Sequence, residues 1–95
     1  MEVDDARTRL SRARIVLALG RVDRLSERER VVLELLGDGL SNSELAKTLG
    51  IAEPTARTHV TRVLSKLDLR SRLQAGLVSQ LERWNRTTES EDRHL

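Results

Sequence analysis

Three predicted helix starts carry the motif Ser-x-x-Glu or Ser-x-x-Gln, at 26–29, 41–44 and 71–74. This motif is a capping box, in which the serine side chain and the Glu or Gln side chain satisfy free backbone N–H groups at the start of a helix. Aliphatic residues at helical spacing follow each box. The three boxes therefore predict helices that begin near Ser26, Ser41 and Ser71.

Glycine and proline positions set the limits of these helices. Gly37 and Gly39 end the first of them and Gly50 ends the second, because glycine is favoured just past a helix C-terminus. Pro54 lies in the first turn of a further helix, where a missing N–H does no harm. That helix is expected over about 53–67.

Residues 4–19 are also expected to form a helix, which Gly20 ends. Asp4 and Asp5 lie at its start, where carboxylates favour the positive end of the helix dipole. Apolar residues recur every seven positions, as in a short coiled-coil seam: Val3, Leu10 and Leu17. This seam has two interpretations, packing on the domain itself or contact with a second copy.

Two helices joined by a tight glycine-containing turn, from Ser41 to Leu67, form a helix-turn-helix unit. Trp84 is the only aromatic residue in the chain, so aliphatic residues must fill the core, as is typical of packed helices rather than of sheets. We predict an all-α fold: a compact helical bundle that contains the helix-turn-helix and is preceded by one extra N-terminal helix.

The chain of 95 residues is long enough for one small domain. Its expected parts are 1–24, an N-terminal helix and linker; 25–84, the helix-turn-helix domain; and 85–95, a disordered polar tail. The last helix is expected to end near Arg83, because the segment that follows is polar and lacks apolar periodicity.

The residue sets that catalysis or metal binding requires are absent from the sequence. There is no cysteine, and His59 and His94 have no ligand partner at helical spacing. No pair of residues resembles a nucleophile with its base. We therefore predict no enzyme, no catalytic residue, no metal site and no cofactor. No segment reaches the roughly 18 apolar residues of a membrane span, so no membrane partner is expected.

The helix expected over 53–67 has two chemically different sides at about 100° per residue. Apolar residues gather on the side expected to face the core: Ala56, Val60, Val63, Leu64 and Leu67. The other side carries Pro54, Arg57, Thr58, Thr61, Arg62 and Ser65. Because this outer side has no acidic residue and Arg and Thr suit base edges, the pattern favours insertion into a DNA groove over an inert solvated surface.

Polar and basic residues at the ends of this unit suit contact with phosphates. Ser41 and Asn42 lie at the N-terminus of the helix before the turn, where free N–H groups bind anions. The helix expected over 53–67 would be the recognition helix of this unit, the one that enters the DNA groove. Lys66 and Arg70 lie near its far end, where the chain should reach the DNA backbone.

Five short motifs occur in an order and spacing that resemble the LuxR-type DNA-binding domain of bacterial transcription regulators. They are LSERE at 25–29, GLSNSELA at 39–46, LGI at 49–51, TARTHV at 55–60 and KL at 66–67. The resemblance covers roughly residues 25–80. It implies a four-helix domain that binds inverted repeats as a dimer, with its third helix in the major groove and its fourth helix commonly at the dimer contact.

By position, the resemblance implies base reading by Arg57, Thr58 and Thr61. It implies contact with the DNA backbone by Thr55, Arg62 and Lys66. The expected partners are double-stranded DNA, a second copy of the chain and RNA polymerase. The expected location is the bacterial cytoplasm, at the nucleoid.

The helix that begins at Ser71 carries large side chains at spacings of three and four: Leu73, Leu77, Gln80, Leu81 and Trp84. Four other helices cannot cover all sides of this helix, so part of its apolar surface should stay exposed in a monomer. The strip of Leu73, Leu77 and Leu81 is therefore the candidate dimer contact. The alternative is that Leu73 and Leu77 are ordinary core residues.

The sequence departs from the family pattern at three positions. Ala52 stands where the family usually has Ser, so the recognition helix lacks a side-chain N-cap, a loss of about 1 kcal/mol. Ala56 replaces a usual Val, and Thr61 stands where many members have Lys or Arg.

Two other functions are weighed against LuxR-type regulation. The first is a promoter-reading domain like that of a sigma factor, which the additional helix from Ser71 argues against. The second is a protein-interaction module that has kept the fold and lost DNA binding. Ala52 and the net charge of only +2 favour this module, whereas Arg57 and Arg62 on an acid-free side argue against it.

Overall fold

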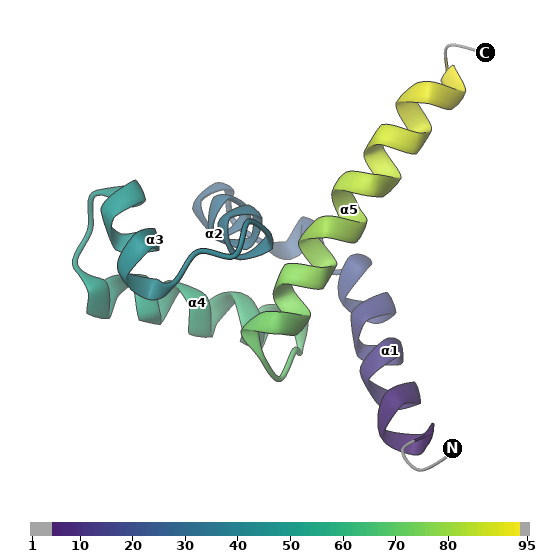
Figure 1. Ribbon diagram of the computed structural model, residues 1–95, viewed down its shortest axis with the longest axis horizontal. Helices are drawn as coiled ribbons and strands as arrows, with labels where there is room; N and C mark the ends of the chain where they lie inside the picture. The colour runs from purple at the N-terminus through teal and green to yellow at the C-terminus, as the bar shows by residue number, and fades with distance from the viewer. Residues whose placement is uncertain (1–4, 94–95) are drawn as a thin grey trace.

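The computed structural model describes residues 5–93, which form five α-helices and one turn of 3-10 helix, η1 (Figure 1). The elements are α1 (Asp5–Leu19), η1 (Val22–Arg24), α2 (Glu27–Gly37), α3 (Asn42–Leu49), α4 (Glu53–Leu67) and α5 (Arg72–Arg93). The described residues form no strand, and the predicted all-α fold is confirmed. Among these helices, none is both long enough and apolar enough to cross a membrane.

The first two capping boxes are present with both of their hydrogen bonds. The Ser26 N–H donates to Glu29 Oε1 over 2.8 Å, and the Glu29 N–H donates to Ser26 Oγ over 3.2 Å. Ser41 and Glu44 repeat the same two bonds with the same lengths. Local sequence therefore determines where α2 and α3 begin.

The third box is only half formed. The Gln74 N–H donates to Ser71 Oγ over 3.3 Å, but Gln74 Oε1 accepts from the N–H of Arg70 instead of Ser71. The glutamine thus fixes the turn that leads into α5 as well as the start of the helix.

Helix α5 is longer than the sequence predicts. It continues past the expected end near Arg83 to Arg93, so residues 85–93 are helical where a disordered tail was predicted. Residues 94–95 lie outside the described residues. No Gly or Pro follows Gly76 to stop the helix, and Glu82 and Arg86 are spaced four apart, as in a stabilising helical pair.

Small residues allow α2 and α5 to cross closely. A Cβ atom on Gly37 would overlap the Ser79 side chain, and a Cβ on Gly76 would lie 3.1 Å from the Leu36 carbonyl oxygen. Side chains of α5 also bind carbonyls at the end of α2: Gln80 donates to Gly37 O over 2.7 Å, and Arg83 donates to Glu34 O over 2.7 Å. The first bond satisfies a carbonyl that the helix C-terminus leaves free. The second adds a donor to the Glu34 carbonyl, which also accepts from the Asp38 N–H.

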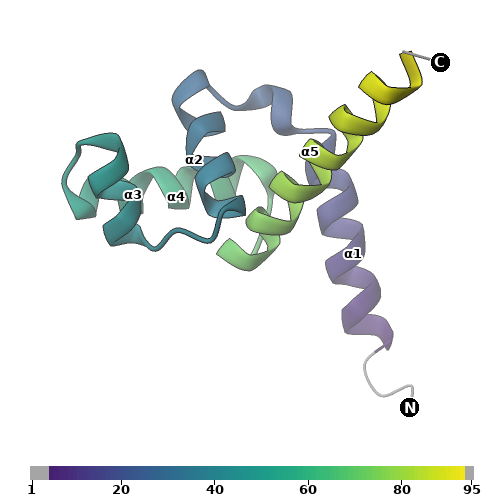
Figure 2. The same ribbon diagram turned by 45° about the horizontal axis from the view of Figure 1, so that its top comes forward.

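Helix α1 packs on the domain through its C-terminal half only. Ala18 is fully buried, and Ile15 and Leu19 pack against the core. In both Figure 1 and Figure 2 the N-terminal end of α1 and the C-terminal end of α5 project away from the rest of the molecule, in different directions.

The predicted seven-residue seam of α1 is exposed. Leu10 is 62% exposed and Leu17 is 57% exposed, while Val3 lies outside the described residues. Packing of Leu10 and Leu17 on their own domain is therefore wrong, because α1 packs through a different side. Contact with a second copy stays a prediction.

Candidate nucleic-acid interface

Helices α3 and α4 form the expected helix-turn-helix. Gly50 ends α3 in the left-handed conformation with φ 68°, and its N–H donates to Ala46 O. The turn is so short that α4 begins at Glu53, and the bounds of α4 coincide with the predicted 53–67. Figure 1 shows α4 below α2 and α3, with its lower side uncovered.

The division of α4 into two sides is confirmed. The buried side chains are Ala56, Val60, Val63 and Leu67, with Leu64 half-buried. The exposed side chains include Thr55, Arg57, Thr58, Thr61 and Arg62. The predicted base-reading residues therefore share one exposed surface that the core holds in place from behind.

The two central threonines of this surface are fixed by their own helix. Thr58 Oγ1 donates to Pro54 O over 3.1 Å, and Thr61 Oγ1 donates to Arg57 O over 3.0 Å. Each hydroxyl proton is thus used inside the helix, as is common for threonine in helices. The hydroxyl oxygens can still accept a hydrogen bond, and the methyl groups can pack on a thymine methyl.

An acidic residue that sequence reasoning missed lies beside Arg57. The Glu53 carboxylate is one helical turn before Arg57, and its Oε1 lies 3.5 Å from the guanidinium nitrogen. Both side chains are about half exposed, so the pair contributes little to stability. Arg57 can therefore leave Glu53 for a base edge at small cost.

Lys66 is engaged within the domain. Its Nζ donates to Glu29 Oε1 over 2.8 Å, and the Glu29 side chain is almost fully buried. The Lys66 ammonium and the Ser26 N–H hold the pKa of Glu29 below its ordinary value. The pair joins the start of α2 to the end of α4, a structural role of Lys66 that sequence reasoning missed.

Arg72 orients the start of α3, a role that sequence reasoning also missed. Its guanidinium donates to Asn42 Oδ1 over 3.0 Å and to Leu40 O over 2.8 Å. The predicted phosphate-binding residues Ser41 and Asn42 are both at this helix start, with Ser41 as N-cap. Because Asn42 accepts from Arg72, its amide nitrogen is the group left to donate to a ligand.

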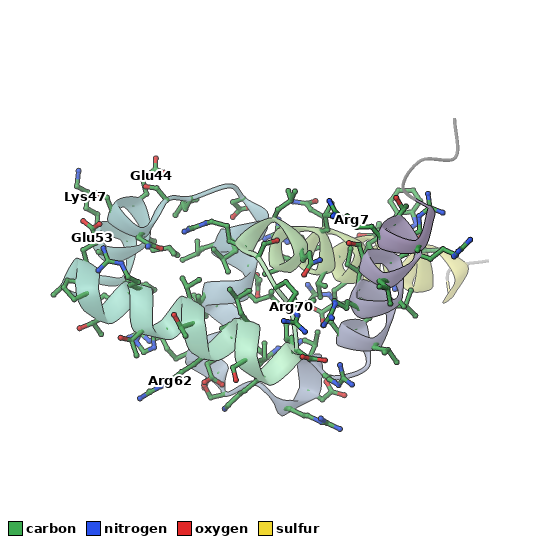
Figure 3. All side chains as sticks on the ribbon, turned by 90° about the horizontal axis from the view of Figure 1, so that it is seen from below. Arg7, Glu44, Lys47, Glu53, Arg62 and Arg70 are labelled. Carbon is green, nitrogen blue, oxygen red and sulfur yellow. The ribbon has the colours of Figure 1, made fainter. Side chains whose placement is uncertain are left out.

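Charge is distributed unevenly over the side of the molecule that α4 exposes. In the view from below (Figure 3), Glu44 and Lys47 of α3 and Glu53 at the start of α4 lie at one end of the molecule. Toward the other end, Arg62 projects from α4 and Arg70 lies between α4 and α1. The positive end of this surface is therefore the C-terminal end of α4.

The apolar strip of α5 is exposed. Leu73 is 71% exposed, Leu77 is 44% exposed and Leu81 is 41% exposed, with Trp84 exposed further along the helix. The alternative that Leu73 and Leu77 are core residues is wrong, because Ala75 and Val78 fill that role. Leu73 and Leu77 of the strip also line an apolar groove, together with Leu36, Leu40 and Gly76.

Comparison with known proteins gives the family. A family profile described as "Bacterial regulatory proteins, luxR family" matches residues 23–79. Transcriptional regulatory protein LnrK of Bacillus subtilis is 49% identical over 55 residues, which are 58% of this chain and 25% of that protein. Nitrate/nitrite response regulator protein NarL of Escherichia coli is 40% identical over 62 residues, 65% of this chain and 29% of that protein.

A third relative is DNA-binding transcriptional activator DevR/DosR of Mycobacterium tuberculosis, 40% identical over 53 residues, 56% of this chain and 24% of that protein. The chain thus matches between 24% and 29% of the length of these relatives. The profile covers more than half of this chain and includes α2, α3 and α4 completely. The chain therefore belongs to the luxR family of bacterial regulatory proteins, and residues 23–79 are a helix-turn-helix DNA-binding domain of the kind found in transcription regulators.

Proposed function

We propose that this domain binds double-stranded DNA in a sequence-specific manner, with α4 inserted in the major groove. The observation that supports this proposal is the exposed side of α4. Basic and hydroxyl side chains lie on this side, and the opposite side of the helix is buried. Arg57 reads guanine through O6 and N7, and Thr58 and Thr61 contact neighbouring bases.

The residues around α4 position the domain on the DNA backbone. The α3 N-terminus offers Ser41 and Asn42, the latter held by Arg72. The remaining contacts are Thr55, Arg62 and Arg70, which are exposed. Lys66 is proposed as a weaker contact, because its ammonium would share its hydrogen bonds between a phosphate and Glu29.

We propose further that two copies bind an inverted repeat through the strip of Leu73, Leu77 and Leu81. An exposed apolar strip on one helix is suited to a two-fold contact, in which the same surface is used on both copies. The exposed Leu10 and Leu17 of α1 are a second candidate for this contact. The strip is small, so self-association in solution should be weak and DNA should strengthen it by holding two copies about one helical turn apart.

The role of a larger protein containing this domain is also a proposal. The relatives are named as transcription regulators, so we infer regulation of transcription in the bacterial cytoplasm, at the nucleoid, with RNA polymerase as a further partner. The additional helix α5 and its exposed strip favour this assignment over the promoter-reading domain of a sigma factor.

The test of DNA binding is selection of bound sequences from a random duplex pool, followed by titration of the selected duplex at two salt concentrations. We expect the selected duplexes to share a recurrent half-site. We also expect log affinity to fall linearly with log salt concentration, with a slope that steepens by about 0.9 for each phosphate contacted. Absence of binding at low salt, with selected and random duplexes alike, would favour the protein-interaction module.

The dimer is tested separately with Leu77→Lys. A folded variant that binds single half-sites normally but has lost cooperativity on inverted repeats supports the α5 contact. Normal cooperativity in a folded variant would exclude α5, and the same substitution at Leu17 would then test α1.

A further inference from the structure

Helix α1 is rich in arginine and lies outside the region that the family profile matches. Between residues 6 and 22 the chain has arginine at 7, 9, 12, 14 and 21 and no acidic residue. Arg7, Arg9 and Arg12 are exposed. This concentration of positive charge exceeds that of α4 itself, which has Arg57, Arg62 and Lys66 together with Glu53.

The fold directs α1 toward the side of the molecule that α4 exposes. In Figure 1, the C-terminal part of α1 lies near the C-terminal end of α4, and the N-terminal end of α1 extends below it, past the level of the uncovered side of α4. From below, both helices lie in front of α2, α3 and α5 (Figure 3). Whatever binds the exposed side of α4 therefore lies next to α1.

One ion pair links the middle of α1 to the C-terminal end of α4. The Arg14 guanidinium lies 3.8 Å from the carboxylate of Asp68, which caps α4. Arg7 is seven residues earlier, about two helical turns, so it lies on the same edge of α1 and faces the same side. In Figure 3, Arg70 lies between α4 and α1, so positive side chains follow one another from Arg62 to Arg70 and on to Arg7.

The arrangement of charge around α1 fits a polyanion better than a membrane surface. A helix that lies on a membrane has a continuous apolar stripe opposite its basic side. In α1 the pairs Arg7/Arg14 and Arg9/Arg12 lie on roughly opposite sides at about 100° per residue, and Leu10 lies beside the first pair. A phosphate on either side of α1 would therefore lie near an arginine side chain.

We propose that α1 is a second DNA-binding element, in which Arg7, Arg9 and Arg12 contact phosphates of the duplex that flanks the segment read by α4. Arg14 is a positioning residue in this scheme, because its partner is Asp68. The inference rests on the proposed function and adds contacts outside the helix-turn-helix. Such contacts strengthen binding to every sequence alike, since phosphates carry no sequence information directly.

The test is the combined variant Arg7→Gln, Arg9→Gln, Arg12→Gln of the whole chain, measured on a duplex with long flanks and on one truncated to the half-site. Glutamine keeps helix propensity close to that of arginine, and circular dichroism checks that the fold is unchanged. On the long duplex, we expect the slope of log affinity against log salt to fall by about 0.9 for each phosphate that is no longer bound, or roughly 2.7 for three phosphates. Base preference should not change.

A matched control is the pair of single variants Arg7→Gln and Arg86→Gln, which each remove one exposed charge. Arg86 belongs to the C-terminal half of α5, and the C-terminal end of that helix projects away from α4 (Figure 1). Only Arg7→Gln should therefore lower the slope, by about 0.9.

Three results would overturn the proposal. An unchanged slope in the triple variant, with normal binding by the wild type, removes α1 from the interface and leaves the role of α4 intact. A triple variant that binds DNA with the wild-type slope but self-associates less assigns α1 to a contact between copies. A wild type that binds no duplex at all removes the proposed function and this inference together.

Discussion

Helices α4 and α1 are both 15 residues long, and both expose arginines on a surface without clustered acids. They differ in how they are held. Helix α4 buries a side chain in every turn, from Ala56 to Leu67, whereas α1 buries only Ala18 fully. The same kind of charge is therefore presented by one helix fixed along its length and by another fixed at one end.

This difference determines what each helix can do with DNA. Base reading needs hydrogen-bonding groups held at defined positions, because a good bidentate contact discriminates only when its geometry is met. Phosphate attraction tolerates movement, since it depends chiefly on charge. We therefore assign specificity to α4 and additional, sequence-independent affinity to α1.

The largest effect should come from the packing that holds α4. Leu67→Ala empties a fully buried position and should lower the free energy of unfolding by about 2–5 kcal/mol. Leu10→Ala, in the exposed part of α1, should change it by less than about 0.5 kcal/mol. Urea unfolding followed by circular dichroism measures both. A large loss for Leu10→Ala that depends on protein concentration would instead place Leu10 in a contact between copies.

The next effect concerns specificity. Arg57→Ala should cost roughly 1–3 kcal/mol of binding at the preferred site and change which base is favoured. Arg7→Gln should weaken preferred and random duplexes by the same factor. Competition titrations with duplexes that differ at single base pairs provide the comparison. If Arg57→Ala weakens all sequences equally, Arg57 is a phosphate contact and α4 is oriented differently in the groove.

A smaller effect is expected from the Lys66–Glu29 pair, which ties α4 to α2. Lys66→Met should lower the free energy of unfolding by about 1 kcal/mol at pH 7, a modest value because Lys66 is 45% exposed. The pKa of Glu29 is lower in the folded state than its ordinary value of 4.5. Its contribution is therefore complete above pH 4.5 and is lost as the pH falls through the folded pKa.

The pH dependence of the free energy of unfolding tests the role of this pair. Wild type and Lys66→Met should differ at pH 7 and converge once the pH has fallen below the lowered folded-state pKa of Glu29, where the carboxyl is protonated. Lys47→Met is the matched control, since exposed Lys47 on α3 should change stability by less than about 0.5 kcal/mol. A difference between the two proteins that does not shrink as the pH is lowered below 4.5 would show that Lys66 acts through its hydrocarbon chain instead of its charge.

Local signals in the sequence were sufficient for the helix starts and for the two sides of α4. Capping boxes act over three residues and burial repeats with the helical period, so Ser26, Ser41 and the apolar side of α4 could all be predicted. The roles of individual residues at the DNA stay predictions, because they depend on a ligand whose position the sequence suggests only through the family resemblance.

The features that could not be predicted depend on residues far apart in the chain. Lys66 meets Glu29 across 37 positions, and Arg72 meets Asn42 across 30. The direction of α1 depends on where Ala18 packs and on the pair between Arg14 and Asp68. No short motif encodes such contacts, because they form only when the helices are assembled.

The smallest effect tests the start of α4, where the chain departs from its family. Ala52 is the N-cap, with the extended backbone that a cap requires (φ −70°, ψ 149°) but no side-chain bond. Pro54 has no N–H, so the Thr55 N–H is the donor that a serine at position 52 would satisfy. Ala52→Ser should therefore raise the free energy of unfolding by about 0.5–1 kcal/mol.

Thermal unfolding measures this gain, which corresponds to a rise in melting temperature of up to about 8 °C for a domain of this size. Ala52→Gly is the control, because glycine is accepted at an N-cap without supplying a side-chain oxygen. The Thr55 N–H of the natural chain is free to bind a phosphate, and a serine hydroxyl would compete for it. Ala52→Ser should thus stabilise the domain without tightening DNA binding, and a tighter complex would mean that an unformed start of α4 limits recognition.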